Sequence, residues 1–182
     1  MVIIWFIGVG IVLLMALIFI TYYSKLVRLT NSIDSSISLV NAQIRRRAAL
    51  APTLLSNVGG YVKNERKLGE EVTSARLALL DAPNMSARLR AGAQLHMAIR
   101  TVLSSAESYP TLQNNERFRQ LRSELLEIDK IVSNTRKSYN DSIMVYNVMM
   151  HSSPAKWFAK LYGFGKREFL KIPAEDSLGE KK

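Results

Sequence analysis

Few side chains in this sequence belong to the types that carry chemistry. The chain has two histidines, His96 and His151, and no cysteine. Disulfides, thiolate metal sites and cysteine nucleophiles are therefore excluded. The two histidines fall in different predicted helices, and neither has a carboxylate at the i, i+4 spacing of a helical metal site. We expect both to be solvated surface side chains, with no metal and no cofactor bound.

Carboxylates offer little more. Glu124, Glu127 and Asp129 form an acidic patch at helical spacing, where ion pairs with arginine or lysine are more common than an acid/base pair. The sequence has no phosphate-binding loop, zinc-protease motif or nucleophile elbow. These features predict a protein that is not an enzyme.

Arginine is the charged residue with the clearest clustering. Three arginines end one predicted helix and three begin another: Arg45, Arg46, Arg47, Arg117, Arg119 and Arg122. Guanidinium groups favour phosphates and carboxylates, so this set is a candidate patch for an anion or an acidic partner. A solvated helix end, favoured by the helix dipole, explains the same residues. No aromatic interleaving supports nucleic acid, which we do not expect as a partner.

The stretch "PAKWFAKLYGFGKREFL" mixes aromatic and basic residues. Its candidate membrane-interface residues are Trp157, Phe158, Lys160, Tyr162, Phe164, Arg167 and Phe169. Large apolar rings beside lysine and arginine are typical of segments that lie at a lipid surface. The same rings could instead cap the core of a helical bundle, and both alternatives stay open.

The N-terminal residues 1–24 contain no charged side chain. Twenty helical residues span about 30 Å, the thickness of the bilayer hydrocarbon core. A cleaved signal peptide is the alternative, but no basic n-region precedes the apolar run and no small-x-small cleavage site follows it. We predict a retained transmembrane anchor, with Tyr22, Tyr23 and Lys25 at the headgroups.

Flanking charge predicts the orientation of this anchor. Lys25 and Arg28 follow the apolar run, and only the α-amino group precedes it. The positive-inside rule then places the N-terminus outside and the rest of the chain in the cytoplasm. A single-pass protein of the bacterial inner membrane is the simplest setting, and its net charge of +10 would face an anionic leaflet.

Helical periodicity continues through the rest of the chain. We predict helices over 25–51, 52–80 and 86–108, and a fourth from about 112. Pro52 should end the first, because the residue before a proline avoids helical geometry. Gly59 and Gly60 would lie inside the second helix, for close packing or as a hinge. Alternating spacings of three and four from Phe118 to Met149 predict a coiled-coil-type seam in the fourth.

Short connections between such helices favour antiparallel neighbours. The predicted fold is all-α: a transmembrane helix at 1–24 that continues into an antiparallel up-down four-helix bundle at 25–153. An interfacial amphipathic segment follows at 154–172, and a disordered tail at 173–182. The last helix would return to the membrane, and the arginine clusters would lie at the distal tip. Polar residues along this helix are expected to fix its register rather than bind a ligand: Arg136, Tyr139, Asn140, Tyr146 and Asn147.

An ordered series of segments resembles the LemA family. The series includes "YYSKLVRLTNSID", "RRRAALAPTLLSNVGGYVKNERKLGEEVTSAR", "AESYPTLQNNERFRQLRSELLEIDKIVSNTRKSYNDSIMVYN" and "GFGKREF". It covers residues 11–170. Two departures occur: Gly59-Gly60 stands for the usual single glycine, and Ile128-Asp129 stands for a Thr-Glu pair. Asp129 is expected to alter a local polar contact.

The resemblance implies a membrane-anchored helical bundle, found mainly in bacteria and often encoded near membrane proteases or envelope-stress proteins. It implies no catalytic residue. We therefore expect a non-enzymatic scaffold or adaptor that contacts lipid, self-associates as a homo-oligomer, shapes the membrane and serves envelope homeostasis. The alternative is an anion- or nucleic-acid-binding membrane protein that uses the arginine patch.

Overall fold

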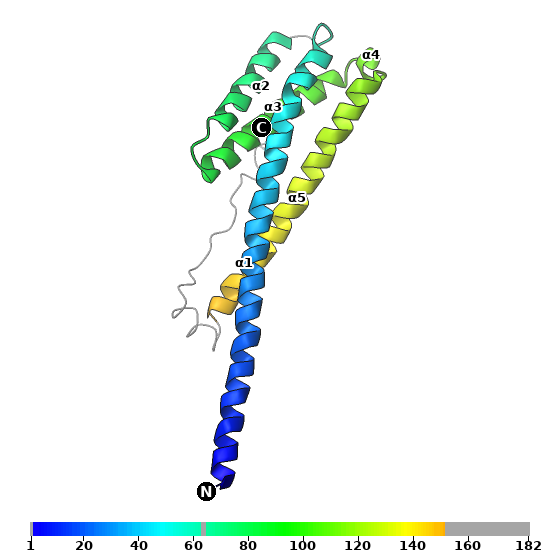
Figure 1. Ribbon diagram of the computed structural model, residues 1–182. Coiled ribbons are helices and arrows are strands. Elements are labelled where there is room, and N and C mark those ends of the chain that lie inside the picture. Colours follow the sequence, from blue (N-terminus) through cyan, green and yellow to red (C-terminus); the bar gives the residue numbers. More distant parts are fainter. Residues whose placement is uncertain (1, 63–64, 152–182) are drawn as a thin grey trace, which may run out of the picture. The chain divides into compact units, whose positions relative to one another are not determined.

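The computed structural model describes residues 2–62 and 65–151, and every regular element in those ranges is a helix (Figure 1). The elements are α1 (Val2–Val58), α2 (Glu65–Leu80), α3 (Met85–Ala106), α4 (Pro110–Gln113) and α5 (Glu116–His151). The all-α prediction is confirmed for this part of the chain. The up-down four-helix arrangement stays a prediction.

The described residues divide into two compact units. The first contains 2–37 and 137–151, and the second contains 38–136 without residues 63 and 64. Helices α1 and α5 therefore each contribute one part to the first unit and one part to the second.

In the first unit, α1 and α5 run antiparallel, side by side (Figure 1). The hydroxyl oxygens of Ser32 and Ser142 lie 3.3 Å apart between them. Their shared core consists of Leu26, Ile33, Tyr139, Ile143, Tyr146 and Met149. These positions give each helix one apolar stripe, with a spacing of seven residues on α1 and of four or three residues on α5. The coiled-coil-type seam stays a prediction.

In the second unit, all five helices contribute to one core. Leu54 of α1, Leu95 of α3, Leu112 of α4 and Leu125 of α5 are almost fully buried in it. Helices α1 and α3 approach closely where Gly92 faces Ile44. A Cβ added to this glycine would lie 2.9 Å from Ile44 Cγ2, which is too close for two carbon atoms.

The first helix does not end near residue 51, as the proline rule predicted, but continues to Val58 with Pro52 inside it. A proline inside a helix lacks the N–H that would bond to the carbonyl four residues earlier, here that of Ala48. Arg76 of α2 supplies the missing donor, because its Nε donates to Ala48 O at 2.9 Å. Burial of Ala51 and Leu54 extends the apolar face past the proline, so tertiary contacts prevail over local geometry.

The pair Gly59-Gly60 was also placed wrongly, because it ends α1 instead of lying within a helix. Gly60 has a φ of 78°, a left-handed conformation that favours glycine over residues with a Cβ. Its N–H donates to the carboxylate of Glu65, the first residue of α2. Glycine here makes the turn between two helices.

The start of the last long helix differs from the expected position near residue 112. A single helical turn, α4, begins with Pro110 and ends at Gln113. After two non-helical residues, α5 begins at Glu116. Asn115 caps the new helix, since its Oδ1 accepts from the N–H groups of Arg117 at 3.0 Å and Phe118 at 3.3 Å. This second helix start was not predicted from the sequence.

Candidate functional site

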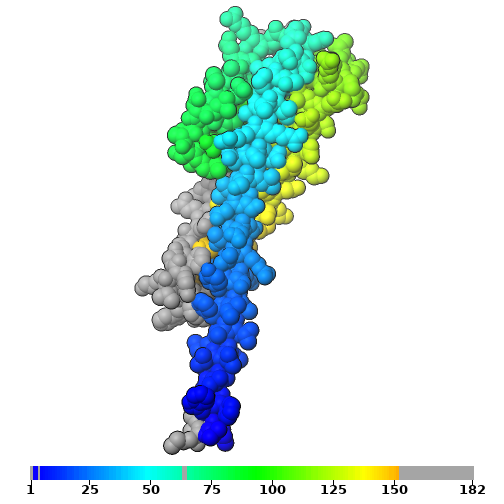
Figure 2. Space-filling model, in the orientation of Figure 1, coloured from blue at the N-terminus to red at the C-terminus, as the bar shows by residue number. Residues whose placement is uncertain are grey.

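The N-terminal part of α1 is apolar and uncovered. Its most apolar 18-residue window has a mean hydropathy of 2.4, and none of that window is buried. Trp5 and Phe6, for example, are 75% and 70% exposed. Figure 2 shows no described element over this blue part of α1 on the visible face. A core helix of a soluble protein would bury such residues, so this helix could cross a membrane.

Residues just beyond the apolar run occupy both faces of α1. Tyr22 packs against the core of the first unit, whereas Tyr23 is exposed and its ring stacks with that of Phe19 at a centroid distance of 6.1 Å. Lys25 is exposed. Two of the three predicted interface residues therefore point outward and one faces α5.

The end of α5 lies beside this same part of α1. Met149 and Leu26 belong to one buried cluster, against which Tyr22 packs. On the outer face of α5, Met144, Val145 and Val148 are exposed. This second apolar stripe was not predicted, although its i, i+1, i+4 spacing is visible in "SIMVYNVMM".

The remaining predicted interface residues lie outside the described residues. They are Trp157, Phe158, Lys160, Tyr162, Phe164, Arg167 and Phe169. Their contact with lipid stays a prediction.

The structure divides the predicted arginine patch. Arg45 and Arg117 are exposed, but the other four have carboxylate partners within 4 Å. These pairs are Arg46–Glu124, Arg47–Asp129, Arg119–Glu116 and Arg122–Glu107. Glu124 and Asp129 thus serve as the salt-bridge partners that their helical spacing predicted. Pairing reduces the positive charge that an anionic surface would meet, and anion binding by the whole patch stays a prediction.

A buried polar cluster joins α1, α3 and α5 inside the second unit. The side chain of Arg47 is only 4% exposed and its Nη2 bonds to Asp129 Oδ1. His96 is also buried, with Nδ1 3.2 Å from the same oxygen. His96 was expected to be solvated and is not, because α3 turns this position inward beside Leu95 and Ile99.

Electrostatics at Asp129 follow from these contacts. Partial burial raises the pKa of its carboxyl, but the hydrogen bond from His96 and the charge of Arg47 outweigh burial and hold the pKa below its ordinary value of 3.8. Asp129 is therefore ionised at neutral pH. An ionised carboxylate is the partner that the buried Arg47 charge requires.

A cavity of about 450 Å³ opens over this cluster. Arg47, His96 and Asp129 line it together with Arg100 and Arg122. Its other lining residues come from α3 with its C-cap and from α5: four are apolar (Ile99, Leu103, Leu125 and Leu126) and two are polar (Ser104 and Glu107). The cavity thus combines a cationic rim, a buried polar floor and an apolar wall.

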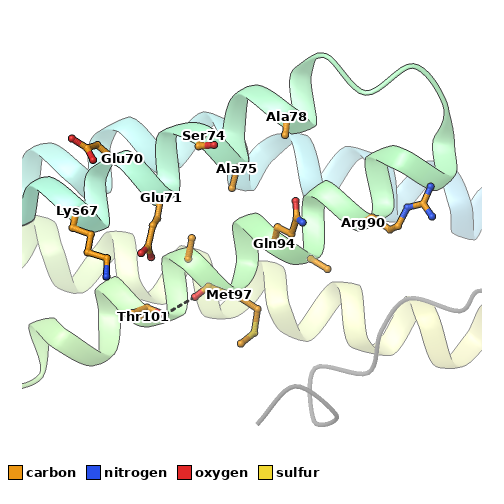
Figure 3. Close-up of a pocket in the computed structure, with 12 residues that line it drawn as sticks. Lys67, Glu70, Glu71, Ser74, Ala75, Ala78, Arg90, Gln94, Met97 and Thr101 are labelled. Carbon is orange, nitrogen blue, oxygen red and sulfur yellow. Dashed lines mark hydrogen bonds between the residues drawn. The ribbon is translucent and has the colours of Figure 1, made fainter. Parts of the chain in front are cut away.

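A larger groove of about 1010 Å³ runs between α2 and α3 (Figure 3). Small side chains such as Ala75 and Ala78 line its middle. Its charged residues lie toward the two ends, with Glu71 at one end and Arg90 at the other (Figure 3). Because these polar groups do not converge, the groove offers no assembled binding site for a small ligand.

Neither hollow contains the arrangement of a metal centre. Within residues 2–62 and 65–151 no group of three or more histidine, aspartate or glutamate side chains could hold a metal ion. His151 is exposed at the end of α5. The non-enzymatic assignment stays a prediction.

The helical fold and the uncovered apolar helix together define a class: in its described residues, this is an all-α protein with one N-terminal helix able to cross a membrane. Comparison with protein families refines this class. The profile of the LemA family matches residues 36–181, which is most of the chain. The chain belongs to the LemA family, as its motifs indicated.

Curated relatives share a shorter segment. Magnetosome proteins MamQ 1 and MamQ 2 of Paramagnetospirillum magneticum are each 27% identical to the chain over 81 residues. Magnetosome protein MamQ of Magnetospirillum gryphiswaldense is 26% identical over 81 residues. The matched segment is 44% of this chain and 30% of each relative. The similarity thus concerns less than a third of those proteins.

Proposed function

We propose that this protein is a non-enzymatic, membrane-anchored helical scaffold or adaptor of the bacterial inner membrane. The observation that carries the proposal is the uncovered apolar part of α1, which continues without a helix break into the charged part of the same helix. Lipid is the solvent in which such a surface is stable. Lys25 and Arg28, both exposed, support a cytoplasmic location for the chain that follows the span.

Two further surfaces would contact the lipid. The exposed Met144, Val145 and Val148 lie on the part of α5 that packs beside Tyr22 and Leu26, where the span ends. Placed at the headgroups, their apolar side chains leave water. The aromatic and basic segment at 154–172, which lies outside the described residues, is proposed to contact lipid as well.

Assembly is the second part of the proposal. A single span with a helical cytoplasmic part, in which α1, α2, α3 and α5 of the second unit would form the four-helix bundle, suits a protein that self-associates and shapes the membrane. The similar MamQ proteins are named magnetosome proteins. Partners among envelope-stress or membrane-protease proteins are those that the family resemblance implies.

Charge placed in the apolar helix tests the anchor. Leu13→Arg with Leu17→Arg adds about 5–7 kcal/mol to the cost of insertion, from about 2.5–3.5 kcal/mol per arginine at a helix centre. The variant should leave the floating membrane fraction and become extractable by alkaline carbonate. A matched control is Leu77→Arg with Leu80→Arg, at exposed leucines of α2. A charged α1 variant that floats like the wild type would contradict the proposal.

Self-association has its own experiment. Crosslinking in native membranes, followed by mass determination in mild detergent, should give species larger than one chain. If only monomers appear at the cellular protein concentration, the scaffold would be a lone adaptor and the assembly part of the proposal would fail.

A further inference from the structure

The cavity over the buried polar cluster has the properties of a ligand site. Its volume of about 450 Å³ lies in the range of small-molecule sites, about 300–1,000 Å³. Residues from three helices line it. Arginines lie at its rim, and leucines form one of its walls. Small-molecule sites typically pair apolar walls with a few convergent polar groups.

The two carboxylates that line the cavity, Asp129 and Glu107, already have cationic partners. Asp129 is bonded to Arg47 and to His96, and Glu107 is 2.9 Å from Arg122 Nη2. An additional cation in a ligand would therefore compete with protein arginines for these oxygens. The arrangement disfavours cationic ligands.

Arg100 is a cation of the cavity that does not pair with either of these carboxylates. It lines the cavity and is exposed, and among the residues that the structure describes it has no carboxylate partner. Ser104, one helical turn further along α3, lines the same cavity and carries a hydroxyl group. A guanidinium beside a hydroxyl is suited to hold a carboxylate or phosphate oxygen.

The apolar wall of the cavity favours a ligand that has an apolar part. Leu126 is 54% exposed, which is high for a leucine beside a cavity, and Leu103 and Leu125 continue the wall inward. Covering Leu126 with an apolar group removes its side chain from water. The cavity therefore has room both for an anionic group and for a short apolar body.

We propose that this cavity binds a small organic anion, with its acidic group on Arg100 and Ser104 and its apolar body against Leu103, Leu125 and Leu126. The buried Arg47–Asp129–His96 cluster forms the rigid floor. Such a site differs from the predicted arginine patch, because Arg100 is central to it whereas Arg45 and Arg117 lie outside it. It does not depend on the scaffold function.

Binding of two probes tests the proposal. Benzoate and phenyl phosphate each carry an apolar ring and an anionic group, and inorganic phosphate carries the charge alone. Calorimetric titration of the full-length protein in detergent at low salt should give dissociation constants in the millimolar range or below for the aromatic anions, and weaker binding for inorganic phosphate. Benzylamine, a cation of similar shape, should not bind.

Variants locate the site. Arg100→Gln should weaken binding of both aromatic anions about tenfold or more, because a hydrogen bond to a charged group contributes about 1.5–3 kcal/mol. Arg117→Gln removes an exposed arginine outside the cavity and should change binding less than twofold. Leu126→Gln should weaken phenyl phosphate more than inorganic phosphate. Neither Arg100 nor Leu126 is buried, so folding should survive in both variants.

Three results would overturn the proposal. The first is that neither benzoate nor phenyl phosphate binds at about 10 mM, roughly ten times a millimolar dissociation constant. The second is an equal loss of affinity in Arg100→Gln and Arg117→Gln, and the third is binding of benzylamine as tight as that of benzoate, or tighter. The first would leave the cavity as a solvent-filled hollow. The second would assign the binding to general positive charge.

Discussion

Buried charge is the main feature of this protein at the scale of single residues. Arg47 looked like one of three equivalent surface arginines in sequence, but it is buried on α1 and bonded to Asp129 of α5. His96 approaches the same carboxylate from α3. Helical spacing predicted that Asp129 would pair with a cation but could not identify which one, because the partners come from distant helices.

The first prediction concerns Asp129→Asn. At neutral pH the variant leaves the buried Arg47 charge without its carboxylate, and we expect a loss of about 2–4 kcal/mol in the free energy of unfolding. This is slightly less than the 3–5 kcal/mol typical of a fully buried pair, because a third of the Asp129 side chain is exposed. Urea unfolding followed by circular dichroism measures it.

The pH dependence of this difference has a definite sign. Because the pKa of folded Asp129 lies below 3.8, the unfolded chain takes up this proton first as pH falls. The contribution of Asp129 is therefore complete above about pH 5, and it is lost as pH falls through the folded pKa. The difference in the free energy of unfolding between the wild type and Asp129→Asn should become smaller below about pH 4. Glu127→Gln, at an exposed position on the same helix, is the control.

A second prediction concerns Pro52 and Arg76. Arg76→Met keeps the aliphatic stem but removes the donor to Ala48 O, and should cost about 1 kcal/mol. In a Pro52→Ala background the new backbone N–H can bond to that carbonyl, so the same change should cost almost nothing. A double-mutant cycle by urea unfolding measures the coupling. Equal costs in both backgrounds would show that Arg76 does not compensate for the proline.

At the scale of elements, the apolar periodicity of the sequence predicted the buried helix faces well. The prolines and glycines predicted the helix ends less well. The apolar stripes of α1 and α5 are the buried stripes of the first unit. The helix end predicted at Pro52 was wrong because a side chain from another helix replaces the missing hydrogen bond. The helix predicted through Gly60 was wrong because a glycine in an αL turn and a glycine in a helix contact look alike in sequence. Local rules fail where a tertiary contact supplies what the backbone lacks.

Two helical glycines give a matched prediction for the elements. Gly69 in α2 has open space around it, so Gly69→Ala should stabilise the protein by up to about 1 kcal/mol through helix propensity. Gly92 in α3 faces Ile44, and Gly92→Ala should destabilise it by about 1–2 kcal/mol, since overpacking costs more than propensity returns. Thermal unfolding compares them. A stabilising Gly92→Ala would contradict the close contact of α1 and α3.

At the scale of the whole molecule, the proposed membrane association would explain why large apolar side chains lie exposed on two helices. Exposed apolar residues cover the first part of α1, and further ones lie on α5 beside the end of that region. The length and hydropathy of the apolar run were sufficient to predict a helix that could cross a membrane. They could not predict the exposed stripe of α5, because which of two adjacent apolar stripes is buried depends on the packing of α1.

The most direct test of the account measures how deep the end of α5 lies relative to the lipid. The chain has no cysteine, so single cysteines at Val148 and Ser138, both on α5 in the first unit, can carry a fluorophore in the full-length protein reconstituted in vesicles. These positions are about 15 Å apart along the helix. We predict strong quenching by headgroup-labelled lipid at Val148 and little at Ser138. Equal and weak quenching at both positions would contradict the return of α5 to the membrane surface.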